Sequence, residues 1–168
     1  PLDAFYRTLL FSFSLFISGA SWVFVSIHEF GYMPIPLACL LTLIFCLSLA
    51  LINAASWFTF SFFCNIHTNH SSSRSQSILM FAATGVFTEW LRTWLFSGFP
   101  WLFAGYSQTE WVLGSWAPLI GVYGISFIIY ASGAGVYVLG RSLQHDSKKD
   151  RSLTIKAVLS ATLLCWLL

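Results

Sequence analysis

Residues 37–63 read LACLLTLIFCLSLALINAASWFTFSFF and contain no Asp, Glu, Lys or Arg. They lie inside a longer uncharged run, because the 44 residues from Phe30 to Ser73 carry no formal charge. A helix rises 1.5 Å per residue and needs about 20 residues to cross the ~30 Å hydrocarbon layer of a bilayer. The stretch is therefore long enough to span a membrane, and it predicts a helical integral membrane protein.

The composition of the whole chain supports the same class. Of 168 residues, 57% are hydrophobic, 18% are aromatic and only 8% are charged, whereas soluble domains have roughly 25% charged residues. A soluble globule of this composition would expose large apolar patches and aggregate. The chain is also too apolar to stay disordered. These numbers exclude a soluble enzyme.

The uncharged runs predict an all-α fold, a polytopic transmembrane helix bundle of about five spans. We expect residues 1–168 to form one transmembrane domain with no soluble domain. Because the chain starts at Pro1 and ends inside an apolar run, we expect it to be part of a longer polypeptide, with the last span truncated. The expected spans are residues 8–27, 37–63, 78–96, 116–139 and 153–168.

The basic residues predict the orientation. With alternating spans, seven of the eight Lys and Arg residues fall on one side, and Arg92 is the exception. The opposite side receives the loops His28–Pro36 and Ser97–Glu110, which contain no Lys or Arg. By the positive-inside rule, the basic side is cytoplasmic. The net charge of +2 is thus a topology signal, and we expect no nucleic-acid partner.

Both loops on the other side are rich in aromatic residues, Gly and Pro. Trp and Tyr favour the headgroup level of a bilayer, where an apolar ring and a polar edge are both satisfied. Gly and Pro indicate turns, so we expect these loops to lie along the interface or to dip back into it, shielded by protein. Two interpretations stay open, an ordinary aromatic belt and a lipid-accessible vestibule.

Glu89 and Arg92 are the charged residues inside the expected span 78–96. At positions i and i+3 they share a helix face and can form an intramembrane ion pair. Each alone would cost about 2.5–3.5 kcal/mol at mid-membrane, so such residues suggest a function. They either lock the helix and the following loop, or contact a lipid headgroup, in which case Arg92 meets a phosphate.

The cysteines and histidines indicate no chemistry. A reactive thiolate needs an electropositive, partly wet site, so we expect the cysteines to be buried small hydrophobes. His67 and His70 lack a carboxylate or thiol that would complete a metal site. We therefore expect no metal and no cofactor. The four cysteines are Cys39, Cys46, Cys64 and Cys165.

Several motifs together resemble the membrane domain of bacterial apolipoprotein N-acyltransferase. They are Thr88-Glu89-Trp90-Leu91-Arg92, Gly98-Phe99-Pro100-Trp101 and Gly105-Tyr106-Ser107-Gln108, preceded by Ser18-Gly19, Trp22-Val23 and Phe30-Gly31, and followed by Ala117-Pro118 and Gly121-Val122-Tyr123-Gly124. The resemblance extends from Phe13 to about Gly140.

The resemblance implies a location and a reaction. The family works in the bacterial inner (cytoplasmic) membrane, where it moves an acyl chain from a phospholipid onto an enzyme cysteine as a thioester. The chain then passes to the α-amino group of the diacylglyceryl-modified N-terminal cysteine of a lipoprotein. Such covalent catalysis divides one acyl transfer into two easier steps. The implied partners are the phospholipid donor, the lipoprotein acceptor and the lipid bilayer.

The family's catalytic Glu, Lys and Cys belong to a periplasmic nitrilase-like domain between its seventh and eighth membrane helices, which has no counterpart in these residues. The five spans would match the family's third to seventh helices, with basic loops cytoplasmic and aromatic loops periplasmic. No catalytic residue is carried over, and the fragment alone is expected to be inactive. The resemblance suggests Trp101 and Tyr106 as vestibule residues, with Phe99 and Trp22 as further candidates. The alternative is a non-catalytic membrane scaffold or transporter-like fragment.

Overall fold

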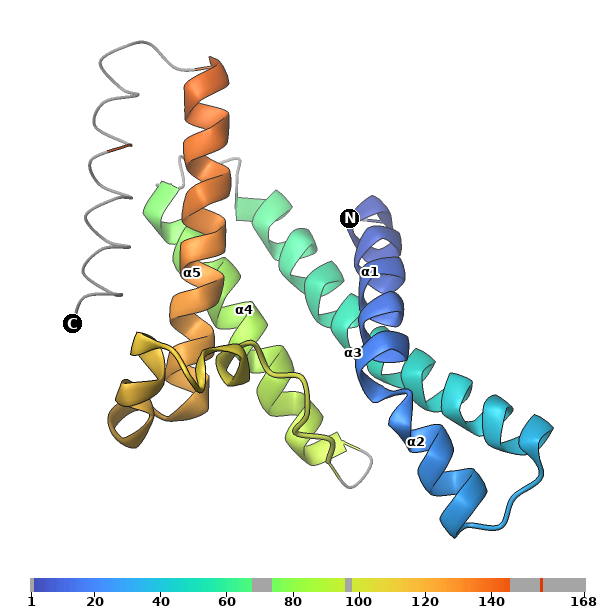
Figure 1. Cartoon of the computed structure of the whole chain (residues 1–168). Helices are drawn as coiled ribbons and strands as arrows, with labels where there is room; N and C mark the ends of the chain where they lie inside the picture. The colour runs from blue at the N-terminus through green and yellow to red at the C-terminus, as the bar shows by residue number, and fades with distance from the viewer. Residues whose placement is uncertain (1, 68–73, 96–97, 146–154, 156–168) are drawn as a thin grey trace. The chain divides into compact units, whose positions relative to one another are not determined.

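The computed structural model describes residues 2–67, 74–95, 98–145 and Ile155 (Figure 1). Every regular element within these ranges is a helix, and they contain no strand. The expected all-α class is therefore confirmed for this part of the chain. Two compact units divide the chain, Pro1–Asn69 and His70–Leu168.

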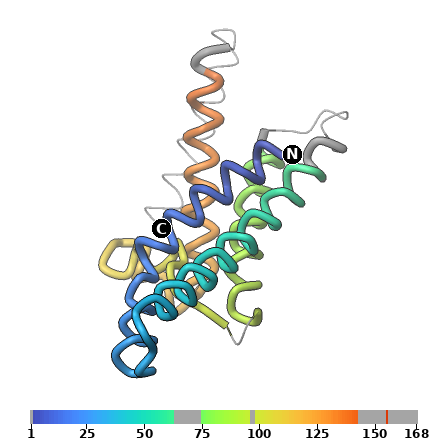
Figure 2. Tube along the Cα trace, turned by 90° about the vertical axis from the view of Figure 1, so that its right-hand side faces the viewer, coloured from blue at the N-terminus to red at the C-terminus, as the bar shows by residue number. Residues whose placement is uncertain are grey.

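The first unit is built from a bent helix and one long helix. α1 (Leu2–Ala20) continues through a turn at Ser21 into α2 (Trp22–Val25) and the π-helix η1 (Ser26–Phe30), with a bend of 50°. α3 (Ile35–His67) follows after a short non-helical link. The tube in Figure 2 shows α1 running beside α3, the pair that packs most extensively in this unit.

Small side chains allow α1 and α3 to pack closely. Ser12, Phe16 and Ala20 are spaced by four residues, so they lie on one face of α1, and all three are buried. Asn53 of α3 donates a hydrogen bond from Nδ2 to Ser12 Oγ at 3.2 Å. Small residues are typical of helix contacts in membranes, where van der Waals packing and hydrogen bonds replace the hydrophobic effect. The buried apolar residues of α3 are Ala38, Cys46, Leu49, Ala50 and Ala54.

The second unit pairs α4 (Arg74–Trp94) with α5 (Ala117–His145). The connection between them includes the 3-10 helices η3 (Ala104–Gln108) and η4 (Val112–Trp116), which pack on α5. α5 is interrupted near its start by Gly121, whose φ of 65° and ψ of 178° are not helical. The connection is therefore a folded part of the unit rather than a free linker.

Two helical segments are long and apolar enough to cross a membrane, Ile35–Phe62 and Val112–Ser142. The bent pair Leu2–Ala20 and Trp22–Phe30 adds a third if it forms one span. α4 has 21 residues and is long enough, but it is not apolar enough to meet this standard. The structure therefore supports two or three of the five expected spans within the described residues. The expected fifth span, 153–168, lies outside the described residues except for Ile155.

Candidate functional site

The candidate site is the aromatic loop, which we define as residues 98–108. It turns back sharply after α4, because the Gly98 N–H donates to the Leu95 carbonyl oxygen at 2.9 Å and the Phe99 N–H donates to the Arg92 carbonyl oxygen at 2.7 Å. Gly98 has a φ of 86°, and a Cβ there would lie 2.4 Å from the Thr93 carbonyl oxygen. Only glycine fits this turn, so the sequence fixes the direction in which the loop leaves α4.

Glu89 of α4 holds the middle of this loop. Its side chain is 1% exposed, and Oε1 accepts hydrogen bonds from the Ala104 N–H at 2.7 Å and from the Tyr130 hydroxyl at 3.0 Å. A buried carboxyl group is costly unless donors of this kind satisfy it. One oxygen atom therefore joins α4, the aromatic loop and α5.

Arg92 lies one turn further along α4 and contacts the same loop. It is 3% exposed, and its Nη1 donates to the Trp101 carbonyl oxygen at 3.3 Å. Its Cζ lies 5.1 Å from the centre of the Phe103 ring, a distance at which a guanidinium is attracted to the face of an aromatic ring. Both buried charged residues of α4 thus contact the aromatic loop.

α5 fixes the loop from the other direction. Ser126 Oγ accepts a hydrogen bond from the Gly105 N–H at 2.8 Å, and both residues are buried. Gly105 lies so close to α5 that a Cβ would be 2.4 Å from the Val122 carbonyl oxygen. The close approach requires a residue without a side chain at this position.

A stack of aromatic rings surrounds Phe103. The Phe103 ring is parallel to the Tyr106 ring, with centroids 5.6 Å apart, and its centroid is 5.7 Å from that of Tyr123. Phe103 itself is buried. Ring pairs at these separations add about 0.5–1.5 kcal/mol each beyond their burial, so they stabilise the loop conformation in addition to its hydrogen bonds.

The outer side of the aromatic loop presents its aromatic side chains. Trp101 is 56% exposed and Tyr106 is 50% exposed, while Phe99 is half-buried. The backbone of the loop is held by buried groups, and the side chains of Trp101 and Tyr106 are partly exposed. This arrangement is that of a braced loop with aromatic side chains on its exposed side.

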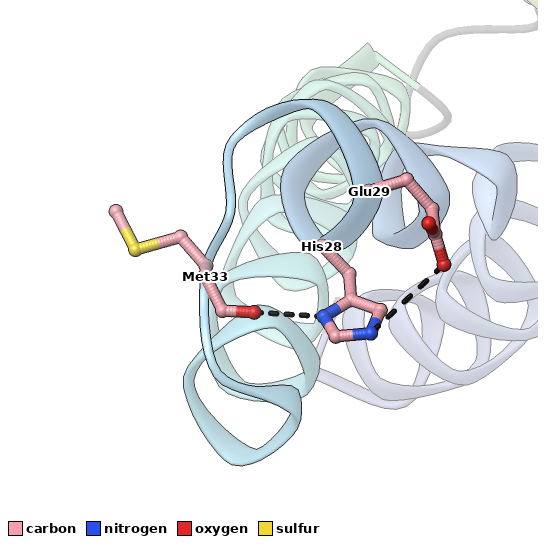
Figure 3. A network of polar contacts seen from close by, with 3 residues as sticks. All are labelled: His28, Glu29 and Met33. Atoms are coloured by element: carbon pink, nitrogen blue, oxygen red, sulfur yellow. Dashed lines mark hydrogen bonds and ion pairs between the residues drawn. The ribbon is translucent and has the colours of Figure 1, made fainter.

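The fourth vestibule candidate, Trp22, belongs to the first unit and is 46% exposed. It begins the bent segment that ends in a polar cluster (Figure 3). There His28 Nδ1 donates to the Met33 carbonyl oxygen at 2.7 Å, and His28 Nε2 lies 4.0 Å from Glu29 Oε1. The imidazole also stacks on the Phe24 ring at 5.6 Å. These contacts close the turn that leads into α3.

Glu89 and Arg92 stand out in the sequence, but the α5 residues that hold Glu89 and the aromatic loop do not. Tyr123, Ser126 and Tyr130 are spaced by three and four residues, so they share one face of the helix. Polar groups on one face of an otherwise apolar span were the available signal, since each needs a partner in a low-dielectric surrounding. Their partners lie far away in sequence and are visible only in the fold.

The described residues contain no cluster suited to metal or thiol chemistry. No group of three or more His, Cys, Asp or Glu residues among them could hold a metal ion. Cys46 is buried as expected, but Cys39 is exposed, so the expectation of burial was wrong for Cys39. Cys165 lies outside the described residues.

Apolar helices and a braced aromatic loop define a class, the helical domain of a membrane protein. Residues 1–135 match the apolipoprotein N-acyltransferase N-terminal domain, and the chain belongs to this family. It is 43% identical over 148 residues to an apolipoprotein N-acyltransferase of Coxiella burnetii, with 88% of this chain and 30% of that protein covered. It is 41% identical over 152 residues to the protein of the same name from Shewanella oneidensis, with 88% and 28% covered.

A third relative has the same name. The chain is 44% identical over 130 residues to the apolipoprotein N-acyltransferase of Methylococcus capsulatus, with 77% of this chain and 25% of that protein covered. The chain therefore spans less than a third of the length of each of these relatives. What the comparisons show for this chain is membership of the family through its N-terminal domain.

Proposed function

We propose that this chain is the membrane domain of an apolipoprotein N-acyltransferase. The parent enzyme would transfer an acyl chain from a phospholipid to the N-terminal diacylglyceryl-cysteine of a lipoprotein. The single observation that carries the proposal is the match of residues 1–135 to the N-terminal domain of this family. The braced aromatic loop supports it by offering a surface suited to lipid.

The role of the domain in this reaction is to anchor the enzyme and to form a lipid-substrate vestibule at the aromatic loop. Trp101 and Tyr106 are half-exposed, and rings with one polar edge contact acyl chains and headgroups together. Holding donor and acceptor lipids beside one thiol raises the rate through proximity. Phe99 is a further contact at this loop, and Trp22, in the first unit, is proposed as a separate lipid contact.

Glu89 and Arg92 form, in this proposal, an intramembrane ion pair that braces the vestibule. The support is their burial, at 1% and 3% exposure, and their hydrogen bonds to Ala104 and to the Trp101 carbonyl oxygen. A guanidinium that is covered in this way is not presented to a lipid phosphate. The bracing role is therefore favoured over contact with a headgroup.

The proposed setting is the bacterial inner membrane, to which these residues contribute five spans of the intact protein. The basic loops face the cytoplasm and the two aromatic loops face the periplasm. The support is the distribution of Lys and Arg, seven of eight of which fall on one side. Catalytic groups would come from the part of the parent protein outside these residues.

The proposal is tested with the intact parent protein in phospholipid nanodiscs that contain a donor lipid with a radiolabelled acyl chain. We expect a hydroxylamine-sensitive acyl adduct on the parent and transfer of the label to a diacylglyceryl-cysteine peptide. The 168-residue chain alone, in the same nanodiscs, is expected to form no adduct. A parent that forms neither adduct nor product would favour a non-catalytic scaffold, and labelling of any of the chain's own four cysteines would contradict the assignment of catalysis elsewhere.

A further inference from the structure

We infer that Tyr130 is a positioning residue for the aromatic loop. Its ring packs on Gly85, and its hydroxyl orients the Glu89 carboxyl group that accepts a hydrogen bond from the loop. The inference rests on the proposed function for its meaning, because it concerns the geometry of the proposed vestibule. Its structural content is independent of that function. It assigns to α5 the control of a loop that follows α4 in the sequence.

The first step is the shared oxygen atom. Glu89 Oε1 accepts from the Tyr130 hydroxyl at 3.0 Å and from the Ala104 N–H at 2.7 Å. Among the described residues, Oε2 accepts no hydrogen bond. The hydrogen bonds that orient the carboxyl group therefore all converge on Oε1, and the loss of the Tyr130 hydroxyl removes one of the two.

The Tyr130 ring packs directly on Gly85 of α4. A Cβ at Gly85 would lie 2.6 Å from Cδ2 and 2.7 Å from Cε2 of Tyr130, so the ring lies directly against the backbone of α4. The Phe81 ring contacts it edge-on, with centroids 6.4 Å apart. Phe81, Gly85 and Glu89 are each four residues apart and share one face of α4. Gly85, which contacts the Tyr130 ring, and the Glu89 carboxyl group therefore lie on the same face of α4.

The face of α5 that carries Tyr130 also holds the aromatic loop directly. Ala104 opens η3, and the next residue, Gly105, donates to Ser126 of α5. Ser126 and Tyr130 are four residues apart on α5, so they lie on the same face. Two successive loop amides are therefore held by one face of α5, one directly and one through Glu89. The position of the exposed Trp101 and Tyr106 follows from how α5 packs on α4.

The inference is tested by hydrogen exchange, followed by mass spectrometry, on the intact parent protein in nanodiscs. Tyr130→Phe keeps the ring and removes only the hydroxyl. We expect the Ala104 amide to exchange about tenfold faster, in line with the loss of a hydrogen bond to a charged group, while amides elsewhere in α4 and α5 keep their rates. Tyr137→Phe is the matched control, because Tyr137 is 65% exposed on the same helix, and it should leave Ala104 unchanged.

A second variant tests the contact between Gly85 and the Tyr130 ring. Gly85→Ala displaces the Tyr130 ring, so it should accelerate exchange at Ala104 by a similar factor, and the double variant should add little to either single change. Unchanged exchange at Ala104 in Tyr130→Phe would overturn the inference. Equal acceleration along the whole of α4 and α5 would overturn it as well, since that pattern indicates general loosening.

Kinetics connect the inference to the proposed function. In the acyl-transfer assay, Tyr130→Phe should raise the KM for phospholipid several-fold with little change in kcat, because it disturbs the lipid surface and not the reacting atoms. A fall in kcat alone would contradict a positioning role at the vestibule. If the parent shows no acyl transfer at all, the proposed function fails, and the exchange rates still decide whether Tyr130 positions the loop.

Discussion

Among the single residues of the second unit, Glu89 connects three segments, because it joins α4 to both the aromatic loop and α5. Its Oε1 accepts hydrogen bonds from the Ala104 N–H of the aromatic loop and from the Tyr130 hydroxyl of α5. Arg92, one turn further along α4, contacts the same loop. Such groups are expensive to bury unless they are paired and hydrogen-bonded. The cost is offset because each supplies a connection between segments that apolar residues could not make.

Replacing Glu89 should therefore be severe. We expect Glu89→Ala to lower the free energy of unfolding by about 3 kcal/mol, because it leaves the Ala104 N–H and the Tyr130 hydroxyl without their shared acceptor. Denaturation of the purified protein in detergent measures the effect. Glu110→Ala is the control, since Glu110 is exposed in the same connection, and its change should stay within about 0.5 kcal/mol. Equal effects of the two variants would contradict the bracing role.

Trp101 should behave in the opposite way, with a large effect on activity and a small one on stability. Its side chain is 56% exposed, and the loop is held through its backbone carbonyl oxygen. We expect Trp101→Ala to reduce kcat/KM for acyl transfer by about tenfold, which corresponds to about 1.4 kcal/mol of lost lipid contact, with normal membrane insertion. Trp111→Ala serves as control, because Trp111 is exposed outside the aromatic loop. Parallel loss of protein level and activity in Trp101→Ala would indicate simple packing.

At the scale of elements, the ends and breaks of helices depart most from the sequence expectation. The expected first span ran unbroken from residue 8 to 27, whereas the structure has a bend of 50° after Ala20. The apolar run continues past this bend to Ile27, so hydrophobicity by itself does not locate it. The break in α5 at Gly121 has a clear sequence signal, a glycine, but glycine also occurs at regular helical positions.

Gly121 and Gly133 of α5 separate these two uses of glycine. Gly121 has a φ of 65° and a ψ of 178°, while Gly133 lies in regular helix, and a Cβ at either would meet nothing within 4 Å. We expect Gly121→Ala to destabilise the protein by about 1–3 kcal/mol through backbone strain alone. Gly133→Ala should be neutral or stabilise it by up to about 1 kcal/mol. Thermal unfolding of both variants tests this, and a harmless Gly121→Ala would mean that the break in α5 is not required.

At the scale of the whole molecule, charge distribution predicts orientation. The cluster that begins at Arg141 is expected in the cytoplasm, and the connection that contains Thr109 is expected in the periplasm. In a variant with the native cysteines replaced by serine, Thr109→Cys should react with a membrane-impermeant maleimide added to intact cells. Arg141→Cys should react only after the cells are lysed. The reverse pattern would overturn the proposed topology.

Local composition alone predicts the class of protein and points to the two charged residues of the apolar span. Long uncharged runs dictate helices in a membrane because every backbone polar group must be satisfied internally there. The same reasoning singled out Glu89 and Arg92, since charges inside an apolar span are rare. Those inferences depend on local composition, which a sequence displays directly.

The contacts of these residues depend on the packing of the helices. The contact between Tyr130 and Glu89 joins positions 41 apart, and that between Gly105 and Ser126 joins positions 21 apart. No spacing rule reaches across such distances, because these pairs exist only once α4 and α5 pack against each other. The conformation of the aromatic loop depends on that packing. The Ala104 and Gly105 amides find their acceptors, Glu89 and Ser126, only when α4 and α5 are in place, and amides in such surroundings need a partner.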